Sequence, residues 1–299
     1  MLETFERHDV DVDGTRIHAV VGGDGPPVLL LHGYPQSHVM WHEVAPGLAA
    51  RHTVVLADLR GYGDSCRPAS EPDHASYAKR AMAADQVGLM RHLGHESFAL
   101  VGHDRGARVA HRLCLDHPEV VSRAALLDIV PTRHVFTHVD RELAQAYYHW
   151  FFLSQDADLP ERLIGADTGY WVRRKLAQWS GAAGIDAFAP EAVAQYVRCF
   201  SDPDVIRASC EDYRAGASID LVHDELDAAA GRRVECPVLV LWGAEGFVGR
   251  AYDVVGVWND YARDVRGQAL GCGHFLAEEQ PAETLAALDD FLASHGTGV

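Results

Sequence analysis

The stretch VGHDRG, residues 101–106, decides the fold. It follows a short apolar run, 97–101 (SFALV), that is typical of a buried strand, and it leads into 106–115, which has helical character. Glycines flank Asp104 at positions 102 and 106, where a Cβ atom would collide with neighbouring backbone in a sharp turn. The pattern predicts a strand–turn–helix elbow that lifts the Asp104 side chain above a sheet. The positive end of the helix dipole would favour an anion there.

Seven further segments around this elbow are predicted to be strands: 4–10, 15–21, 27–31, 52–57, 121–127, 237–242 and 266–270. The first two flank Asp13-Gly14, a dipeptide typical of a tight hairpin turn. Helical spacing recurs at 77–93 and at 284–293. Most of these strands are almost continuously apolar and alternate with helices, which indicates a parallel sheet covered on both faces. The sequence therefore predicts an α/β fold with a mostly parallel, eight-stranded sheet flanked by helices.

The middle of the chain has a different pattern. Residues 131–220 are rich in aromatic side chains and Arg, with helical periodicity and no convincing strand. We therefore predict a core domain made of 1–130 and 221–299, with 131–220 inserted as a helical cap. Such a cap would lie over the carboxyl edge of the sheet, where open α/β sheets bind ligands.

The bulk composition narrows the function classes. The 299 residues carry a net charge of -17 with His neutral, and this repels nucleic acid and anionic membranes. The N-terminus is too polar for a signal peptide, and no apolar run is long enough to span a membrane. Six scattered Cys residues without CxxC or zinc spacing indicate a reducing compartment. We expect a cytoplasmic protein without metal or cofactor; the oligomeric state is open, with a homodimer as one arrangement.

Asp104 is the predicted nucleophile. Taken alone, an Asp before a helix is more often an N-cap. Here HGYP (32–35) precedes the elbow and Gly-His (273–274) follows it, in the chain order that the α/β-hydrolase fold requires. A carboxylate is already ionised and needs no base to activate it. It can displace a leaving group from a saturated carbon and form an alkyl ester.

The ester must then be cleaved, and His274 fits that step. It follows the last predicted strand and would take a proton from the water that attacks the ester carbonyl. The developing oxyanion needs two donors, and the backbone N–H groups of Tyr34 and Arg105 are the expected pair.

An acid should orient His274, and three candidates exist. Asp128 ends the strand after the elbow helix, although it could instead anchor the entry to the cap. Glu245 follows the 237–242 strand, where many relatives of this fold place their acid. Asp253 is a remoter option. The position of Asp128 favours it.

With these features in place, the chain resembles the fluoroacetate dehalogenases (haloacetate dehalogenases) of the α/β-hydrolase superfamily. The resemblance covers nearly the whole chain. The motifs that carry it are HGYPQ (32–36), DLRGYGDS (58–65), HDRGAR (103–108), LDI (127–129), YHW (148–150), DYRAG (212–216) and GHF (273–275). The first two and the Gly-His are shared across the superfamily, whereas HDRGAR, the His-Trp pair and DYRAG are much more specific.

The resemblance implies a role for each matching residue. Asp104 attacks the halogen-bearing carbon, Arg105 and Arg108 hold the substrate carboxylate, His149, Trp150 and Tyr213 stabilise the departing halide, His274 activates water, and Asp128 orients His274. The implied reaction is hydrolysis of a small 2-haloacid, with fluoroacetate giving glycolate and fluoride. The 243–250 segment (GAEGFVGR) lacks a clear family signature.

Elementary chemistry agrees with these roles. Arg105 and Arg108 are three residues apart at a helix start and share a face beside the nucleophile. Their guanidinium forks suit a carboxylate, and they would supply the local cation that an acidic protein needs for an anionic substrate. Alternatively, the two Arg side chains could pair with surface acids. The aromatic run around His149 and Trp150 could likewise serve packing alone, and Trp179 could either line the pocket or serve packing.

Two other functions fit parts of the pattern. An epoxide hydrolase would use the same Asp and His, with cap tyrosines such as Tyr148 and Tyr213 protonating the epoxide oxygen. The paired Arg residues argue against it, because they suit an anionic substrate. A non-catalytic binding protein could keep the fold and lose the chemistry, but the predicted nucleophile, base and acid are all present.

Overall fold

The computed structural model describes residues 1–156 and 158–293. Its sheet has eight strands in the order β1-β2-β4-β3-β5-β6-β7-β8. Only the β1/β2 and β2/β4 pairs are antiparallel. The strands are β1 (Glu6–Val12), β2 (Thr15–Gly22), β3 (Pro27–Leu31), β4 (Thr53–Ala57), β5 (Phe98–His103), β6 (Val121–Leu127), β7 (Val238–Gly243) and β8 (Val265–Leu270). The predicted eight-stranded, mostly parallel sheet is confirmed.

The N-terminal hairpin forms at the predicted turn, with one strand displaced. Asp13 and Gly14 both have positive φ, 49° and 82°, as a two-residue hairpin turn requires. The strand predicted at 4–10 lies at Glu6–Val12, where Val12 pairs with Thr15. The prediction was wrong by two residues. Only Val10 of this strand is buried, so the alternation of apolar and polar residues gives little indication of where the strand begins and ends.

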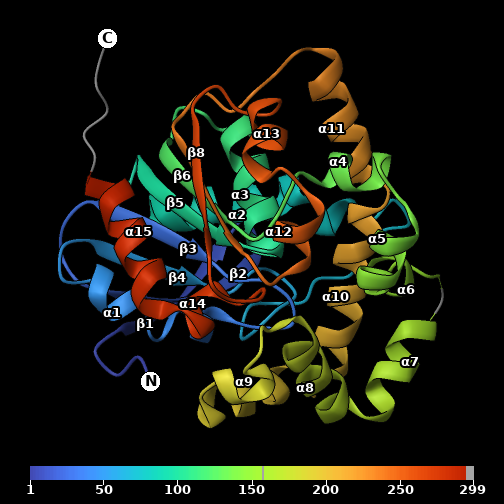
Figure 1. The fold of residues 1–299 in the computed structure, drawn as a ribbon. Helices are drawn as coiled ribbons and strands as arrows, with labels where there is room; N and C mark the ends of the chain where they lie inside the picture. Colours follow the sequence, from blue (N-terminus) through green and yellow to red (C-terminus); the bar gives the residue numbers. More distant parts are fainter. Residues whose placement is uncertain (157, 294–299) are drawn as a thin grey trace.

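Helices cover both faces of the sheet, as Figure 1 shows. They are α1 (Ala45–Leu48), α2 (Lys79–His92), α3 (Arg105–Asp116), α12 (Phe247–Ala251), α13 (Val254–Asn259), α14 (Leu276–Glu279) and α15 (Pro281–Ala293). All six residues of the central strand β5 are buried, because helices cover it on both sides.

The chain between β6 and β7, called the helical segment below, contains helices and no strand among its described residues. The helices are α4 (Thr132–Thr137), α5 (Arg141–Ala146), α6 (Tyr148–Leu153), α7 (Leu159–Ala166), α8 (Thr168–Trp179), α9 (Pro190–Phe200), α10 (Pro203–Gly216) and α11 (Ile219–Ala229). Three of them, α7, α8 and α9, lie along the bottom and lower right of Figure 1. The boundary expected at residue 220 falls inside α11.

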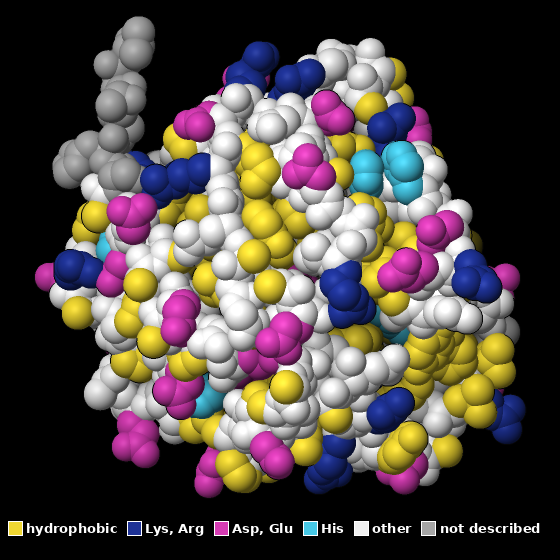
Figure 2. Space-filling view, viewed as in Figure 1, with side chains coloured by type: hydrophobic (Ala, Val, Ile, Leu, Met, Phe, Trp, Pro, Cys, Tyr) yellow, Lys and Arg dark blue, Asp and Glu magenta, His cyan; other side chains and the backbone are white. Residues whose placement is uncertain are grey.

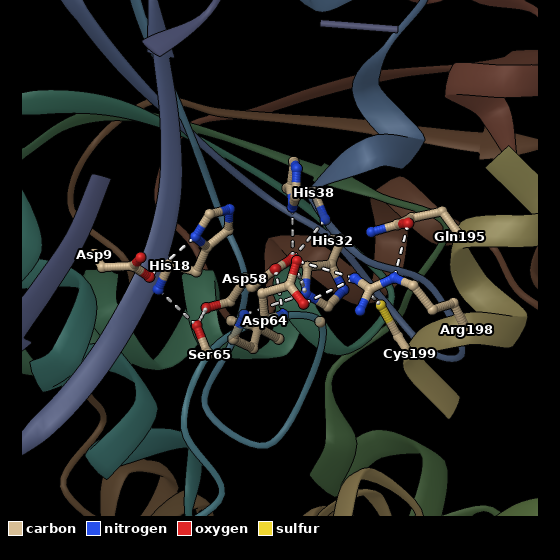
Figure 3. Close-up of polar contacts among 12 residues, drawn as sticks. Asp9, His18, His32, His38, Asp58, Asp64, Ser65, Gln195, Arg198 and Cys199 are labelled. Carbon is tan, nitrogen blue, oxygen red and sulfur yellow. Dashed lines mark hydrogen bonds and ion pairs between the residues drawn. The ribbon is translucent and has the colours of Figure 1, made fainter. Parts of the chain in front are cut away.

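The loops at the carboxyl ends of β3 and β4 are tied together through Asp58 (Figure 3). Its carboxylate accepts hydrogen bonds from the backbone N–H of His38 (2.7 Å) and of Asp64 (2.8 Å), and from the His38 ring (3.0 Å). His32 accepts one from the backbone N–H of Leu59 (3.2 Å). These buried contacts fix the loop after β3, which reaches the elbow.

Candidate active site

The elbow has the strained geometry that the sequence predicts. Asp104, between β5 and α3, has φ 46° and ψ −113°. A Cβ atom on Gly102 would lie 2.6 Å from the Ala107 backbone, and one on Gly106 would lie 2.4 Å from the carbonyl oxygen of His32. Only glycine fits at either position, so the turn can be sharp enough to present the Asp104 carboxylate to the cavity.

The Asp104 carboxylate is held and kept ionised by its neighbours. The backbone N–H of Tyr34 donates to its Oδ2 at 3.0 Å. Burial by itself would raise the pKa of Asp104, but the charges of His274 and Arg108 outweigh it, and the pKa lies below its ordinary value. An ionised carboxylate is therefore available without a base.

His274 and Asp128 form the expected pair. Nδ1 of His274 lies 2.6 Å from Oδ2 of Asp128, whose Oδ1 accepts a hydrogen bond from the Gly243 N–H at 2.9 Å. Burial lowers the pKa of His274, but the hydrogen bond and charge of Asp128, with the charge of Asp104, raise it above the ordinary value. Asp104, Asp128 and His274 line one cavity of about 280 Å³.

The other two candidate acids are engaged elsewhere. Glu245 is exposed, and its carboxylate accepts a hydrogen bond from the Ala182 N–H at 3.2 Å. The Asp253 carboxylate caps α13 by accepting from the Gly256 N–H at 3.0 Å. Of the three acids, Asp128 is the one that contacts His274.

Arg105 lies buried behind the nucleophile, with one edge of its guanidinium already occupied. Its Nε and Nη2 donate to the two carboxylate oxygens of Asp212 at 2.8 and 2.7 Å. Asp212 also contacts the ammonium of Lys79. Burial raises the pKa of Asp212, but Arg105 and Lys79 lower it well below its ordinary value. Arg105 is therefore fixed in place by a buried carboxylate shared with Lys79.

Arg108 is bound less completely. Its Nη1 donates to the Val130 carbonyl oxygen at 3.0 Å and to the Thr132 hydroxyl at 3.1 Å. Its Nε is buried and has no hydrogen-bond partner within residues 1–156 and 158–293. Like Arg105, Arg108 is buried beside the cavity and is not on its lining.

The aromatic residues come from α6 and α10 of the helical segment. His149 and Trp150 line the cavity, whereas Tyr213 lies behind them, with its ring 5.8 Å from the His149 ring. The Arg105 guanidinium lies 4.2 Å from the Tyr213 ring centre, and that of Arg108 lies 4.4 Å from the Trp150 ring centre. The predicted carboxylate and halide groups are therefore adjacent.

Two polar atoms of this aromatic group are buried and unpaired. They are Nδ1 of His149 and the hydroxyl of Tyr213, neither of which has a hydrogen-bond partner in the described part of the chain. Burial, and then the charge of Lys175, lower the pKa of His149 well below its ordinary value, so its ring is neutral. A neutral imidazole keeps one N–H to donate.

Only one group of side chains in the described residues has ligand atoms close enough to hold a metal ion, namely His18, His38 and Asp58. Its Asp58 carboxylate is already engaged by backbone N–H groups (Figure 3), and none of the three lines the cavity. No helix in the described residues is both long and apolar enough to cross a membrane.

Comparison with known proteins identifies the family. A model described as the alpha/beta hydrolase fold matches residues 26–281. A fluoroacetate dehalogenase from Burkholderia sp is 48% identical, with 100% of this chain and 97% of that protein covered. The chain belongs to the fluoroacetate dehalogenase family of alpha/beta hydrolases.

Two further relatives place this alpha/beta hydrolase among its neighbours. A soluble epoxide hydrolase from Corynebacterium sp. (strain C12) is 36% identical, over 94% of this chain and 95% of its own. The crystal structure of an alpha/beta hydrolase from Nostoc sp PCC 7120 has a TM-score of 0.96 and 57% identity, covering 99% of this chain and 100% of its own.

Sequence reasoning missed several residues that shape the site of this dehalogenase-family chain. Lys79 received no role, and neither did Asp212, although it lies in the DYRAG motif. Trp179, whose ring is 4.5 Å from that of His149, was open between packing and lining; it lines the cavity. No local spacing could have indicated these contacts, because they join segments far apart in the chain.

Proposed function

We propose that this protein hydrolyses small 2-haloacids, with fluoroacetate converted to glycolate and fluoride. The observation that carries the proposal is the single cavity lined by Asp104, Asp128 and His274, with the Tyr34 N–H on one oxygen of the nucleophile. The 48% identity to a fluoroacetate dehalogenase over the full chain supports carbon–halide bonds as the target.

In the first step, the free oxygen Oδ1 of Asp104 attacks the carbon that bears the halogen. The C–O bond forms as the carbon–halogen bond breaks, and the halide leaves with the electron pair. Oδ2 becomes the carbonyl oxygen of the resulting ester and stays beside the Tyr34 N–H. The nucleophile needs no proton transfer, since it is already ionised.

In the second step, water attacks the ester carbonyl carbon while His274 accepts its proton. Negative charge develops on Oδ2, where the backbone N–H groups of Tyr34 and Arg105 act as donors. Collapse breaks the bond to the glycolate oxygen, which takes the proton from His274. The second water proton then leaves the Asp104 carboxyl through the same ring to solvent, and the carboxylate is restored. Because esterification removes the negative charge of Asp104, one cause of the raised pKa of His274 disappears just when the ring must act as a base.

The substrate carboxylate and the halide bind to adjacent groups of side chains, since each Arg guanidinium lies over one of the aromatic rings. Arg105 and Arg108 provide the positive charge for the carboxylate, because an acidic surface gives none at long range. The N–H groups of His149 and Trp150 and the Tyr213 hydroxyl donate to the leaving halide. Fluoride has a concentrated charge, so these donors stabilise the transition state more than the ground state.

The helical segment supplies the halide side of this site. We propose that residues 131–220 act as a cap on a core made of 1–130 and 221–299. This division is supported by the origin of His149, Trp150 and Tyr213 in α6 and α10, whereas the nucleophile, acid and base follow strands of the sheet.

Epoxide hydrolysis is the second candidate, supported by the 36% identical relative. It would use the same nucleophile and base, with Tyr148 and Tyr213 protonating the epoxide oxygen. The Tyr148 hydroxyl already contacts the Lys175 ammonium at 2.7 Å, which leaves Tyr213 as the tyrosine with an unpaired hydroxyl.

The assembly of the protein is also proposed. Hydrophobic side chains are exposed at the lower right of Figure 2, the region of α7 and α8 in Figure 1. Leu159, Leu163 and Tyr170 of these helices are 47%, 59% and 65% exposed. A homodimer could bury this surface, and light scattering would measure its mass.

The six free cysteines support a cytoplasmic location, and the net charge of -17 argues against nucleic acid as a partner.

Incubation of the full chain with fluoro-, chloro- and bromoacetate, and separately with styrene oxide, tests the function. We expect halide release, measured by ion chromatography, without diol formation. Diol without halide would support the epoxide hydrolase, and ligand binding without either product would indicate a non-catalytic protein.

A further inference from the structure

Glu279 connects the loop of the catalytic histidine to the helical segment. This half-buried residue ends α14, five residues after His274. Its Oε1 accepts a hydrogen bond from the Phe275 N–H at 2.8 Å, and its Oε2 accepts one from the Gly273 N–H at 2.9 Å. Oε2 also accepts from the Gly181 N–H at 2.7 Å, which belongs to the helical segment. One carboxylate therefore holds three backbone donors from two parts of the chain.

The backbone of His274 itself completes the junction. Its N–H donates to the Trp179 carbonyl oxygen at 2.8 Å, so three consecutive N–H groups of the catalytic loop are bound to Glu279 or to the helical segment. The Trp179 side chain packs against the His274 ring at 5.7 Å and against the His149 ring at 4.5 Å. Movement of this strip of the helical segment would therefore displace the base.

The two backbones are in direct contact. A Cβ atom on Gly273 would lie 2.3 Å from the Gly181 nitrogen and 2.5 Å from the Trp179 carbonyl oxygen. A Cβ atom on Gly181 would lie 2.5 Å from Oε2 of Glu245, 3.1 Å from the Gly273 nitrogen and 3.2 Å from Oε2 of Glu279. Glycine at both positions lets the Glu279 carboxylate reach all three donors.

We propose that Glu279 is a positioning residue that aligns His274 for ester hydrolysis by clamping its loop to the strip 179–181. The inference rests on the proposed function, because it assumes that His274 activates the hydrolytic water. Capping of α14 would account for the Phe275 contact alone. It does not account for the contacts to Gly273 and Gly181, which bring the helical segment into register with the catalytic loop.

The clamp has a step-specific consequence. Asp104 attacks the substrate without giving a proton to His274, so ester formation does not need the clamp. Ester hydrolysis does need it, because a general base must lie within hydrogen-bond reach of the attacking water. A displacement of the base of about 1 Å can cost up to about 100-fold in rate.

The experiment compares E279Q with wild type, using chloroacetate and the full chain. The amide keeps one acceptor oxygen but turns an NH2 group toward backbone N–H donors, so part of the clamp is lost. Rapid-quench halide release measures ester formation in the first turnover, and steady-state release with intact-protein mass spectrometry measures ester hydrolysis. We expect an unchanged first turnover, a steady-state rate lower by roughly tenfold, and accumulated ester on Asp104.

Two further variants make the test independent of one substitution. G181A crowds the Gly273 nitrogen and Oε2 of Glu279 without removing a carboxylate, and it should give the same accumulation of ester even if E279Q does not fold. E283Q makes the same chemical change at an exposed position four residues further along the chain and should behave as wild type.

The pH profile adds a readout that a merely structural role would not move. The charge of Glu279 is one of the smaller causes that raise the pKa of His274, after those of Asp128 and Asp104. The apparent pKa of ester hydrolysis should therefore fall in E279Q. If both steps slow equally, or if steady-state hydrolysis is unchanged in E279Q and G181A, the clamp is refuted while dehalogenation stands. A wild-type enzyme that releases no halide overturns the proposed function and the clamp together.

Discussion

The cavity has one wall built from the strand ends of the core and another built from the helical segment, and the two walls hold their polar groups differently. On the core wall, the Asp104 carboxylate accepts a hydrogen bond from the Tyr34 N–H. The Asp128 carboxylate is hydrogen-bonded to His274 and to the Gly243 N–H. On the helical wall, Nδ1 of His149 and the Tyr213 hydroxyl are buried without partners in the described residues.

This difference indicates a division of labour. Groups that are paired before substrate binds keep their geometry, and no reorganisation is needed when the bond forms. A buried donor without a partner costs about 1–3 kcal/mol, and this cost is relieved when an anion arrives to accept its hydrogen bond. Under the proposed function, the core wall would serve bond formation, and the helical wall would favour the state in which the halide has become charged.

The largest expected effect comes from removing the base on the core wall. His274→Asn should leave ester formation intact and reduce turnover by on the order of 10³-fold or more. Intact-protein mass spectrometry after addition of haloacetate should show a trapped adduct on Asp104. The exposed His92→Asn is the matched control, and an unmodified H274N protein would contradict the assignment of the two steps.

Arg108 lies where the two walls meet, and its substitution tests how they cooperate. Its guanidinium lies against Trp150 of the helical wall and its charge lowers the pKa of Asp104 on the core wall. Lys keeps the charge but lacks the planar fork, so Arg108→Lys should weaken carboxylate binding by about 2 kcal/mol, or roughly 30-fold in KM. The exposed Arg91→Lys serves as control. An unchanged KM for fluoroacetate would place the carboxylate elsewhere.

Most of the fold could be predicted because it depends on local sequence patterns. The apolar runs specify the strands, and the Asp13-Gly14 dipeptide specifies the hairpin, since both residues need positive φ. The short helices α12 and α13 were not predicted. Each has only five or six residues, and helices this short depend on tertiary packing more than on sequence periodicity.

The site also has one part that local patterns predict and one part that they do not. Asp104, Asp128 and His274 follow strands of a parallel sheet, so chain order alone predicts that they meet at one edge. The Arg105–Asp212 and Glu279–Gly181 contacts join residues 107 and 98 positions apart. Such contacts depend on how the helical segment sits on the core, and sequence spacing carries no information about that.

A smaller effect is expected on the helical wall. Tyr213→Phe removes one unpaired hydroxyl, so defluorination should slow by roughly tenfold, with dechlorination affected less because chloride spreads its charge. The ratio of the two steady-state rates is the measurement. Tyr170→Phe removes an exposed hydroxyl and should leave that ratio unchanged. Equal losses for fluoroacetate and chloroacetate would show that the hydroxyl does not face the leaving group.

The last expected effect is on stability and not on activity, and it concerns the contact between the two walls. Glu278 of α14 accepts hydrogen bonds from Tyr196 of α9 (2.8 Å) and from Gln36. Burial raises the pKa of Glu278 to about 8 against the opposing effect of these donors. The buried Oε1 of Gln36 has no partner in the described residues, so after rotation of the Gln36 amide this oxygen could accept a hydrogen bond from a protonated Glu278.

Because the native state keeps this proton above the ordinary Glu pKa and the unfolded state loses it, the free energy of unfolding should fall as pH rises from about 4.5 to about 8. Glu278→Gln should remove that dependence. Urea unfolding should show equal stability of variant and wild type near the acid end of this range. At the alkaline end the variant should gain up to about 4 kcal/mol, while E283Q tracks wild type. Parallel pH dependences in E278Q and wild type would mean that Glu278 is ionised in the fold, and the junction would then hold a buried charge rather than a neutral acid.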